Sequence, residues 1–426
     1  MIVLLLTIFV LGYAAIAFEN AIKINKTASA LITGVLCWVV YIFFTANKLA
    51  VNDSLLKHLG DISGILFFLL GAMTIVELID AHDGFDTIAR FVSSTNKRSL
   101  IWIVGFLSFF LSAILDNLTT TIVMVSLLRK LVKNQDDRLL FVGIVVIAAN
   151  AGGAWTPIGD VTTTMLWIGG QISSSNIMLK LFLPSLVCLI VPLIVVSVSI
   201  KGNVERVEIQ RFVSSGLLSK SKQTKILILG ILILVLVPMF KMATHLPPFM
   251  GMMLGLGLLW VVTEIMHRSY DYEEKKHLTL VSALHNIDIS SILFFLGILM
   301  SIAALEASGI LTAIALGLSK SVGNLSVIVM SIGLSSAVID NVPLVAATQG
   351  MYSLGQYPMD SYIWEFLAYC AGTGGSILII GSAAGVAAMG MEKIDFFWYI
   401  KKISWLALMG FFSGAFVYIV FDMLLH

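Results

Sequence analysis

Charged side chains are scarce in this sequence of 426 residues. Asp, Glu, Lys and Arg make up 12% of it, whereas 58% of the residues are hydrophobic. Soluble globular domains carry about a quarter charged residues, so lipid must cover much of this chain. The backbone of a chain in lipid has to satisfy its own hydrogen bonds, which long apolar runs do as helices. The sequence therefore predicts an all-α integral membrane protein.

Cysteine and charge imbalance are lacking too. Cys37, Cys188 and Cys370 lie in apolar runs, without the spacing of a disulfide framework or a zinc site. The formal net charge is +1, which gives no sign of nucleic-acid binding. No nucleophile stands near a base and an orienting group, so neither enzyme activity nor a cofactor is expected.

Apolar runs that approach or reach the length of a bilayer crossing recur along the chain. They occupy residues 2–18, 28–44, 62–80, 181–200, 226–240, 250–266, 289–306 and 403–424. Two more stretches, 139–171 and 362–391, are apolar at both ends and rich in Gly, Ser, Thr and Pro between them. Each of these two is predicted to be one broken helix.

Two stretches have legs that look too short to cross. Asp116-Asn117 divides residues 99–131, and Asp340-Asn341 divides residues 325–352. At about 1.5 Å per residue the first pair of legs reaches about 24 and 20 Å, against a hydrocarbon core of about 30 Å. Both stretches are predicted to be re-entrant hairpins with tips near the midplane, covered there by protein or water.

The basic residues predict the orientation. With ten crossings and two hairpins, 21 of the 26 Lys and Arg residues fall on one side, and the other side holds only Lys48, Lys57, Lys180, Lys241 and Lys320. The positive-inside rule makes the first side cytoplasmic. Both termini are then expected outside.

The sequence also contains an internal duplication. Asp61-Ile-Ser-Gly-Ile-Leu-Phe-Phe-Leu resembles Asp288-Ile-Ser-Ser-Ile-Leu-Phe-Phe-Leu, and Asp-Asn and Gly-Gly pairs follow in both halves at nearly the same separation. We expect a first repeat at 1–200, a cytoplasmic linker at 201–225 and a second repeat at 226–426. Five crossings per repeat is an odd number, so the second repeat is inserted upside down. Inverted repeats with discontinuous helices and a midplane site are typical of secondary transporters.

Three carboxylates, those of Asp116, Asp160 and Asp340, are predicted near the bilayer centre without a Lys or Arg beside them. A charge in that position costs at least about 2.5 to 3.5 kcal/mol, which indicates a function. An unpaired carboxylate there binds a proton or a cation. The oxygen-rich neighbours suit a hard cation such as sodium, and soft sulfur ligands are absent.

Each candidate site residue has a side-chain or backbone oxygen that can face one of the two breaks or one of the two hairpin tips. The main candidates for ion and proton binding are Asp116, Asn117, Asn150, Asp160, Thr162, Thr163, Asp340, Asn341 and Ser376, with sodium expected at Asp116, Asn117, Asp160, Asp340 and Asn341. Secondary candidates are Thr119, Thr120, Thr156, Gly152, Gly153, Thr373, Gly374, Gly375, Ser382 and, as a proton entry group, Glu77. The glycines are expected to expose unwound carbonyls, although Gly-Gly pairs also suit close helix packing alone.

Other polar residues are given structural roles. Asp61 and Asp288 are expected to cap the starts of their helices. The histidines His58, His82 and His285 are expected to be solvated.

Coupling follows from electrostatics. Low dielectric favours the protonated carboxyl, and a bound cation favours the ionised one, so proton and sodium compete for the same oxygens. A carrier of small organic acids or arsenite with the same architecture is an alternative. A cation channel, or a scaffold that conducts nothing, is another.

The residues at the breaks and tips resemble a known family. Leu115-Asp116-Asn117-Leu118-Thr119-Thr120-Thr121, the stretch from Asn150 to Thr163, Asp340-Asn341-Val342-Pro343 and Gly374-Gly375-Ser376 are similar to NhaD-type sodium/proton antiporters of the ion transporter superfamily. The resemblance covers nearly the whole chain. It implies exchange of sodium or lithium for protons across a bacterial inner membrane. It also implies a homodimer in which scaffold helices form the contact while hairpins and broken helices move.

Overall fold

The computed structural model describes residues 1–17, 19–85, 92, 94–205, 219–268, 270–271 and 276–425. Regular structure in these ranges is helical, apart from an isolated bridge between Asn96 and Asn203. Eight of the described helices are long and apolar enough to cross a membrane. The chain is therefore an all-α integral membrane protein, as its composition predicts.

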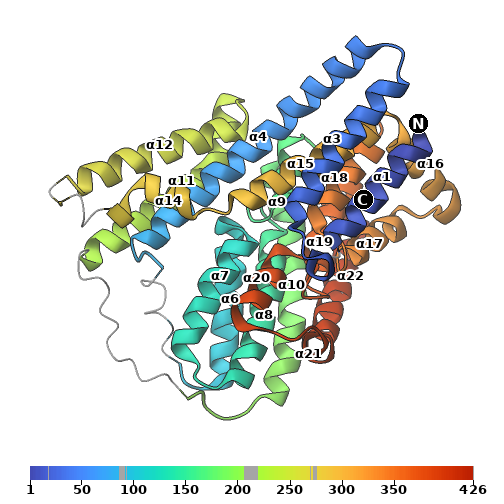
Figure 1. Cartoon of the computed structure of the whole chain (residues 1–426). Coiled ribbons are helices and arrows are strands. Elements are labelled where there is room, and N and C mark those ends of the chain that lie inside the picture. Colours follow the sequence, from blue (N-terminus) through green and yellow to red (C-terminus); the bar gives the residue numbers. More distant parts are fainter. Residues whose placement is uncertain are drawn as a thin grey trace.

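The first half of the chain begins with three helices and a short one. They are α1 (Ile2–Ala17), α2 (Glu19–Ile22), α3 (Lys26–Phe44) and α4 (Lys48–Ala81). The two legs that meet at Asp116 are α6 (Lys97–Leu115) and α7 (Asn117–Leu131). The first broken helix consists of α8 (Gln135–Gly153) and α9 (Val161–Ile168), and α10 (Ser174–Ser199) ends the half (Figure 1).

The second half repeats this order with additions. Its first elements are α11 (Lys220–Thr244), α12 (Pro248–Met266), η1 (Lys276–Leu278), α14 (Leu280–Asn286) and α15 (Ile289–Ala307). Next come α16 (Ile310–Val322), α17 (Leu325–Ser335), α18 (Asn341–Met351), α19 (Tyr362–Gly374) and α20 (Ala383–Glu392). The chain ends with α21 (Phe396–Tyr399), the π-helical η2 (Ile400–Ser404) and α22 (Trp405–Leu425). Residues 206–218 of the predicted linker lie outside the described residues.

Helices of the two halves pack in exchanged pairs. α3 packs on α15, and the corresponding helices α12 and α4 also pack together. The leg α6 packs on α8, as α17 does on α19, and α10 packs on α22. A duplication related by a two-fold axis would produce these pairings, so they support the hypothesis of inverted repeats.

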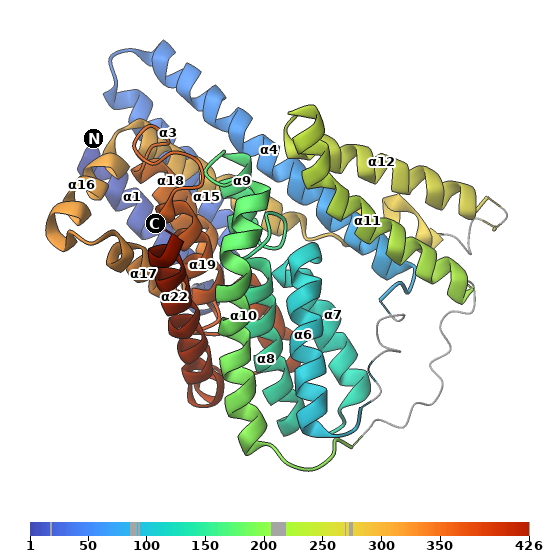
Figure 2. The ribbon, with the colours of Figure 1, turned by 180° about the vertical axis from the view of Figure 1, so that it is seen from behind.

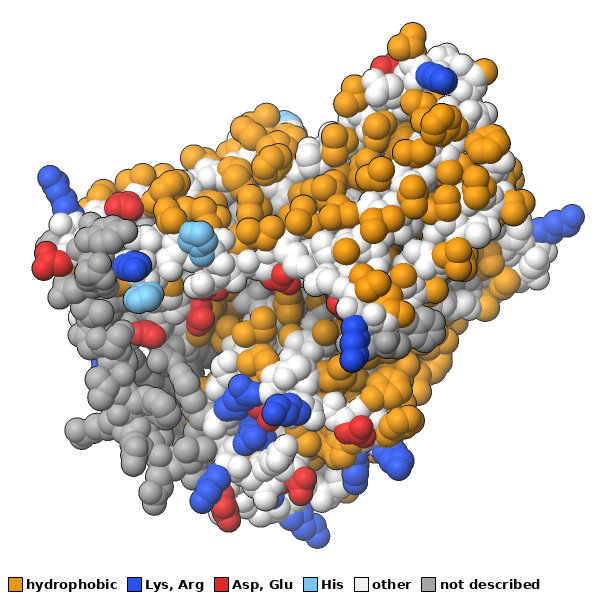
Figure 3. All heavy atoms as spheres, viewed as in Figure 1, with side chains coloured by type: hydrophobic (Ala, Val, Ile, Leu, Met, Phe, Trp, Pro, Cys, Tyr) orange, Lys and Arg blue, Asp and Glu red, His pale blue; other side chains and the backbone are white. Residues whose placement is uncertain are grey.

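Two groups of helices position the site. Figures 1 and 2 show α4, α11 and α12 side by side as one layer, with α6, α7, α8 and α10 gathered in a second group. Apolar side chains cover much of the face over α3, α4 and α12, whereas Lys and Arg gather toward the lower end of the molecule (Figure 3). The interface between the layer and the second group passes close to the hairpin tip at Asp116.

Three expectations about helix bounds are wrong. α6 begins at Lys97 and has 19 residues, about 29 Å, so it is not a short leg. α16 was not predicted, because its 13 residues are too few for a crossing; it bends by 117° into α17. Asp61 lies inside α4, which begins 13 residues earlier after the cap Asn47; the polar first turns of α4 resemble a loop in sequence. Asp288 does cap α15, as expected.

His82 follows α4 and is fully buried, so its expected solvated position is wrong. Its ring stacks on that of His267, with 5.0 Å between ring centroids, and its Nδ1 donates to the Leu78 carbonyl at 2.6 Å. Burial lowers the pKa of His82 to about 4; the bond to Leu78 opposes this shift, and the charge of His267 adds to it. His82 is therefore neutral at physiological pH.

The His82 environment predicts an acid-sensitive fold. The unfolded state takes up a proton near its ordinary pKa of about 6.5, so stability is complete above that pH and falls as the pH drops toward 4. At about pH 5 the loss is on the order of 2 kcal/mol. The measurement is the pH dependence of the unfolding midpoint of purified protein, compared with His82→Gln. Equal acid dependence in both proteins would contradict the assignment.

Candidate ion-binding site

Polar side chains cap the four helices that start at the breaks and tips. Asp116 Oδ1 accepts from the Thr119 amide at 2.7 Å at the start of α7, and Asp160 Oδ1 accepts from the Thr162 amide at 2.8 Å at the start of α9. Asp340 and Ser382 cap α18 and α20 in the same way. The positive ends of four helices thus each face a polar oxygen of the chain itself.

A buried hydrogen-bond network joins the two halves. Asn117 Nδ2 donates to Asp160 Oδ2 at 2.5 Å and to Asn150 Oδ1 at 3.0 Å. Asn150 Nδ2 donates to Ser376 Oγ and Ser382 Oγ, both at 2.9 Å. Asp160 is 1% exposed and Asn150 is fully buried, so this network lies in the interior of the protein. It connects the first hairpin tip, the first break and the second break.

Asp160 is the best-enclosed carboxylate of the three. Its Oδ1 accepts from both the amide and the hydroxyl of Thr162, and its Oδ2 accepts from Asn117. A carboxylate has about four acceptor positions, so one remains for a proton or a cation. The Asn341 side chain lies beside Asp160, but its buried Nδ2 makes no hydrogen bond of normal geometry in the described part of the chain.

Asp116 has an unusual backbone. Its φ is +86°, in the region that favours glycine, whereas Asp340 at the corresponding tip has a φ of −48°. A non-glycine residue in that region is uncommon and is found at functional sites. Both Oδ atoms of Asp116 accept from Thr119, the second through the hydroxyl at 3.0 Å. The strained tip therefore holds this carboxylate in one orientation.

The glycine pairs lie where two helices approach closely. Gly152 and Gly153 are the last residues of α8, and the break follows them. A Cβ on Gly152 would lie 2.1 Å from the Phe109 carbonyl oxygen, and one on Gly374 would lie 2.0 Å from that of Gly333. The hairpin legs α6 and α17 reach the breaks only because these positions lack a side chain.

The other predicted residues are distributed around the network. Thr156 Oγ1 donates to the Ala113 carbonyl at 2.7 Å, which ties the first break to α6, and Thr163 Oγ1 donates to the Asp160 carbonyl at 2.9 Å. The Thr373 hydroxyl donates to the Tyr369 carbonyl of its own helix at 2.6 Å. The buried Thr120 hydroxyl has no hydrogen-bond partner within the described ranges. Glu77 lies away from the network, near the end of α4, and accepts from Asn286 Nδ2 at 2.9 Å.

Sequence reasoning missed several residues that hold the site. Ser112 Oγ donates to the Ala149 carbonyl at 2.5 Å, and Ser336 Oγ donates to the Ala371 carbonyl at 3.0 Å, at corresponding places in the two halves. Tyr399 donates to the Ser376 carbonyl at 2.9 Å. The matching serines of the repeats were the available signal for the first pair.

The site carboxylates have no basic partner among the described residues. The ion pairs found there join Lys97 to Asp137, Lys180 to Asp422, and both Arg129 and Arg138 to Glu392. Asp160 is near enough to Asp116 and Asp340 for electrostatic repulsion. However, no group of three or more acidic, His or Cys side chains close enough to share a metal ion occurs in the described ranges.

Two hairpin tips and two helix breaks, brought together around unpaired carboxylates in an all-helical membrane protein, define the class as a secondary transporter. A family model described as a citrate transporter matches residues 13–372. Sodium/proton antiporters 1 and 2 of Arabidopsis thaliana are 51% and 47% identical to the chain, each over 97% of it and over 71% and 98% of their own lengths. The Na(+)/H(+) antiporter NhaD of Alkalimonas amylolytica is 32% identical over 93% of this chain and 86% of its own. The chain belongs to the NhaD-type sodium/proton antiporters of the ion transporter superfamily.

The network predicts that the Ser376 hydroxyl stabilises the fold. Its loss in Ser376→Ala leaves one Asn150 bond unmade, which costs about 1 kcal/mol. Ser185→Ala is the matched control, because that buried hydroxyl on α10 has no hydrogen-bond partner in the described part. Denaturation of the purified variants should show a lower unfolding free energy for Ser376→Ala only. An equal loss in both would contradict the assigned network.

Proposed function

We propose that the chain exchanges sodium or lithium for protons by alternating access, with cation and proton competing for buried carboxylates. The observation that carries the proposal is Asp160, which is 1% exposed, accepts three hydrogen bonds and has no basic partner in the described part. Neutralisation by either a proton or a cation removes the cost of this charge in low dielectric. A carrier that moves readily only when neutralised exchanges the two ions.

The helix ends favour a cation over an anion. In discontinuous helices the positive N-terminal ends usually attract an anionic substrate. Here Asp116, Asp160 and Asp340 already occupy those ends with carboxylates of the chain. A citrate or another small acid would meet three like charges and no described Lys or Arg. The name of the matching family model is therefore a weaker guide to the substrate than the site is.

The network also links the two halves during transport. Asn150 has its oxygen turned toward Asn117, which holds Asp160, and its amide nitrogen toward Ser376 and Ser382. Three hydrogen bonds in series, Asp160 to Asn117, Asn117 to Asn150 and Asn150 to Ser376, connect a change of charge at Asp160 to the second break. We place Asn150 as the positioning residue between the repeats, and Asn117 and Thr162 as direct partners of the carboxylate.

The remaining features of the proposal come from the family and from the charge distribution. We propose a homodimer in a membrane with sodium and proton gradients, such as a bacterial inner membrane, with both termini outside. The relatives at 47% and 51% identity are plant proteins, so a plant membrane is the alternative location. A cation channel is the second candidate function, and it would carry sodium without counter-flow of protons.

The test is dequenching of a pH-sensitive dye in everted vesicles after addition of sodium, lithium, potassium or citrate. The native chain should respond to sodium or lithium and not to citrate. Asp160→Asn should lower the rate at least about a hundredfold, because it removes the competing charge. Asp116→Asn and Asp340→Asn should also lower it, and Asp53→Asn, an exposed acid of α4, should not. Normal exchange in Asp160→Asn, or a response to citrate alone, would overturn the proposal.

A further inference from the structure

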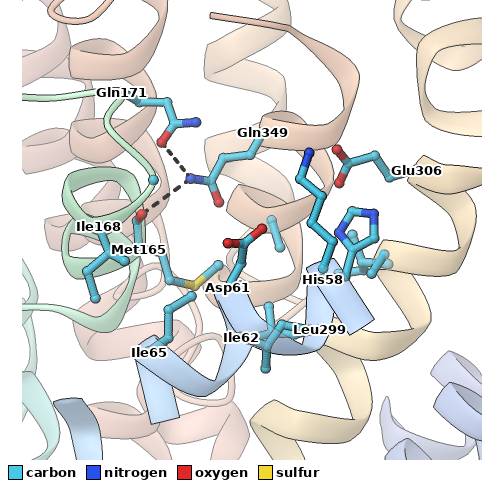
Figure 4. Close-up of a pocket in the computed structure, with 15 residues that line it drawn as sticks. His58, Asp61, Ile62, Ile65, Met165, Ile168, Gln171, Leu299, Glu306 and Gln349 are labelled. Carbon is cyan, nitrogen blue, oxygen red and sulfur yellow. Dashed lines mark hydrogen bonds between the residues drawn. The ribbon is translucent and has the colours of Figure 1, made fainter. Parts of the chain in front are cut away.

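Two cavities lie where the α4 layer meets the helices of the site. The first, of about 390 Å³, is bounded by α4, α9, α15 and α18. Figure 4 shows Asp61 of α4 and Glu306 of α15 beside this space, with Gln349 of α18 above Asp61. The second, of about 150 Å³, is bounded by α4, α7 and the segment that leads into α15, and includes Asp80 and Asp288.

The same positions of the two repeats line the two cavities. Met73, Val76, Glu77 and Asp80 of α4 line the second cavity, and the residues 226 positions later, Leu299, Ile302, Ala303 and Glu306 of α15, line the first. Asp61 in the first cavity corresponds to Asp288 in the second through the repeated Asp-Ile-Ser motif. Ile122 of α7 and Ala346 of α18, 224 positions apart, correspond as well. The two cavities are therefore counterparts, because residues at matching positions of the two repeats line them.

We propose that these cavities are the two mouths of one ion pathway, and that the acid pair in each mouth captures cations on that side only. The outer mouth is the first cavity, with Asp61 and Glu306, and the inner mouth is the second, with Asp80 and Asp288. The proposal rests on the proposed function and adds the route and the capture groups to it. In the outer mouth, Asp61 belongs to the Asp-Ile-Ser motif of the first half, and Glu306 lies near the end of α15 in the second half. In the inner mouth, Asp288 belongs to the motif of the second half, and Asp80 lies near the end of α4 in the first half.

The charges of the two mouths differ. All four acids are exposed, so they can meet ions from solution. The outer mouth also contains Lys57 and His58, which offset its two acids. The inner mouth adds Glu77 and contains no Lys or Arg among its described lining residues. Clefts of one sign raise the local concentration of counter-ions and their rate of arrival. In both mouths the acids outnumber the Lys and Arg residues among the described lining residues.

The mouths also differ in depth. Thr119 lines the inner mouth, and its amide and hydroxyl bond the Asp116 carboxylate at 2.7 and 3.0 Å. A small cavity of about 20 Å³ beside Asp116 shares Met73 with that mouth. The outer mouth instead reaches apolar residues, Ile65, Met165 and Ala346, and none of the three site carboxylates lines it. Through Thr119, the inner mouth therefore borders a site carboxylate, and the outer mouth does not.

The experiment measures the sodium KM of exchange separately from each face, in right-side-out and everted vesicles. Asp288→Asn should raise the KM about two- to fivefold at the cytoplasmic face only, with maximal rate unchanged, because steering acts on arrival. Asparagine still caps α15, so the fold is retained. Asp61→Asn should have the same effect at the outer face only. Both effects should shrink at high ionic strength.

A variant that removes a positive charge should change the KM in the opposite direction, which damage to the fold would not do. Lys57→Gln removes the offsetting charge of the outer mouth and should lower the KM at that face. Asp53→Asn and Asp136→Asn, exposed acids outside both cavities, are the matched controls and should leave both faces unchanged. Equal KM changes at both faces, or no KM change in Asp61→Asn and Asp288→Asn, would contradict the proposal that each acid pair captures cations on one side only. Activity that persists in Asp160→Asn would instead overturn the proposed exchange site.

Discussion

A helix that ends inside a membrane leaves backbone amides that water cannot reach, and this chain has four such helix starts near one another. Each start is capped by a side chain of the chain, and at three of them the cap is an aspartate. The carboxylate is stabilised by the helix end, but its full charge still has no basic partner in the described part. A site formed in this way holds negative charge where lipid makes charge costly. Its need for a proton or a cation follows from that balance.

Duplication explains how one short chain supplies all four starts. The exchanged packing of α3 with α15 and of α12 with α4 brings the two halves together, and the close approach at Gly152 and Gly374 allows α6 and α17 to reach the breaks. Asn150 then bonds both halves through one side chain. The corresponding cavities at the two ends of the α4 and α15 pair are a further product of the same symmetry.

The sequence predicted the parts of the fold that depend on local pattern. Long apolar runs, the Asp-Asn pairs and the Gly-rich breaks marked the membrane class, the tips and the discontinuous helices. The short α16 escaped prediction because its 13 residues are too few for a crossing. The polar first turns of α4 escaped it because a membrane helix that extends beyond its apolar run has no hydropathy signal there. The same limit hid the buried position of His82, which depends on its stacking with a residue of α12's end.

For the candidate site, the residue types could be chosen from the sequence, but the contacts between them could not be predicted. Asn117, Asn150, Asp160, Thr162 and Ser376 were chosen for their oxygens, and the structure brings them into one network. The bonds from Asn150 to Ser376 and Ser382 span more than half the chain, which no local pattern reveals. The glycine pairs were chosen as sources of carbonyl ligands, and the close approach of another helix at Gly152 and Gly374 could not be predicted from local sequence.

Proton release on sodium binding tests directly whether the two ions compete at Asp160. Purified protein in weakly buffered detergent is titrated with sodium across neutral and alkaline pH while an indicator follows the protons released. We expect sodium to displace protons from the native chain and to release markedly fewer from Asp160→Asn. Sodium binding without proton release, or equal release from Asp160→Asn, would contradict competition at the buried carboxylate.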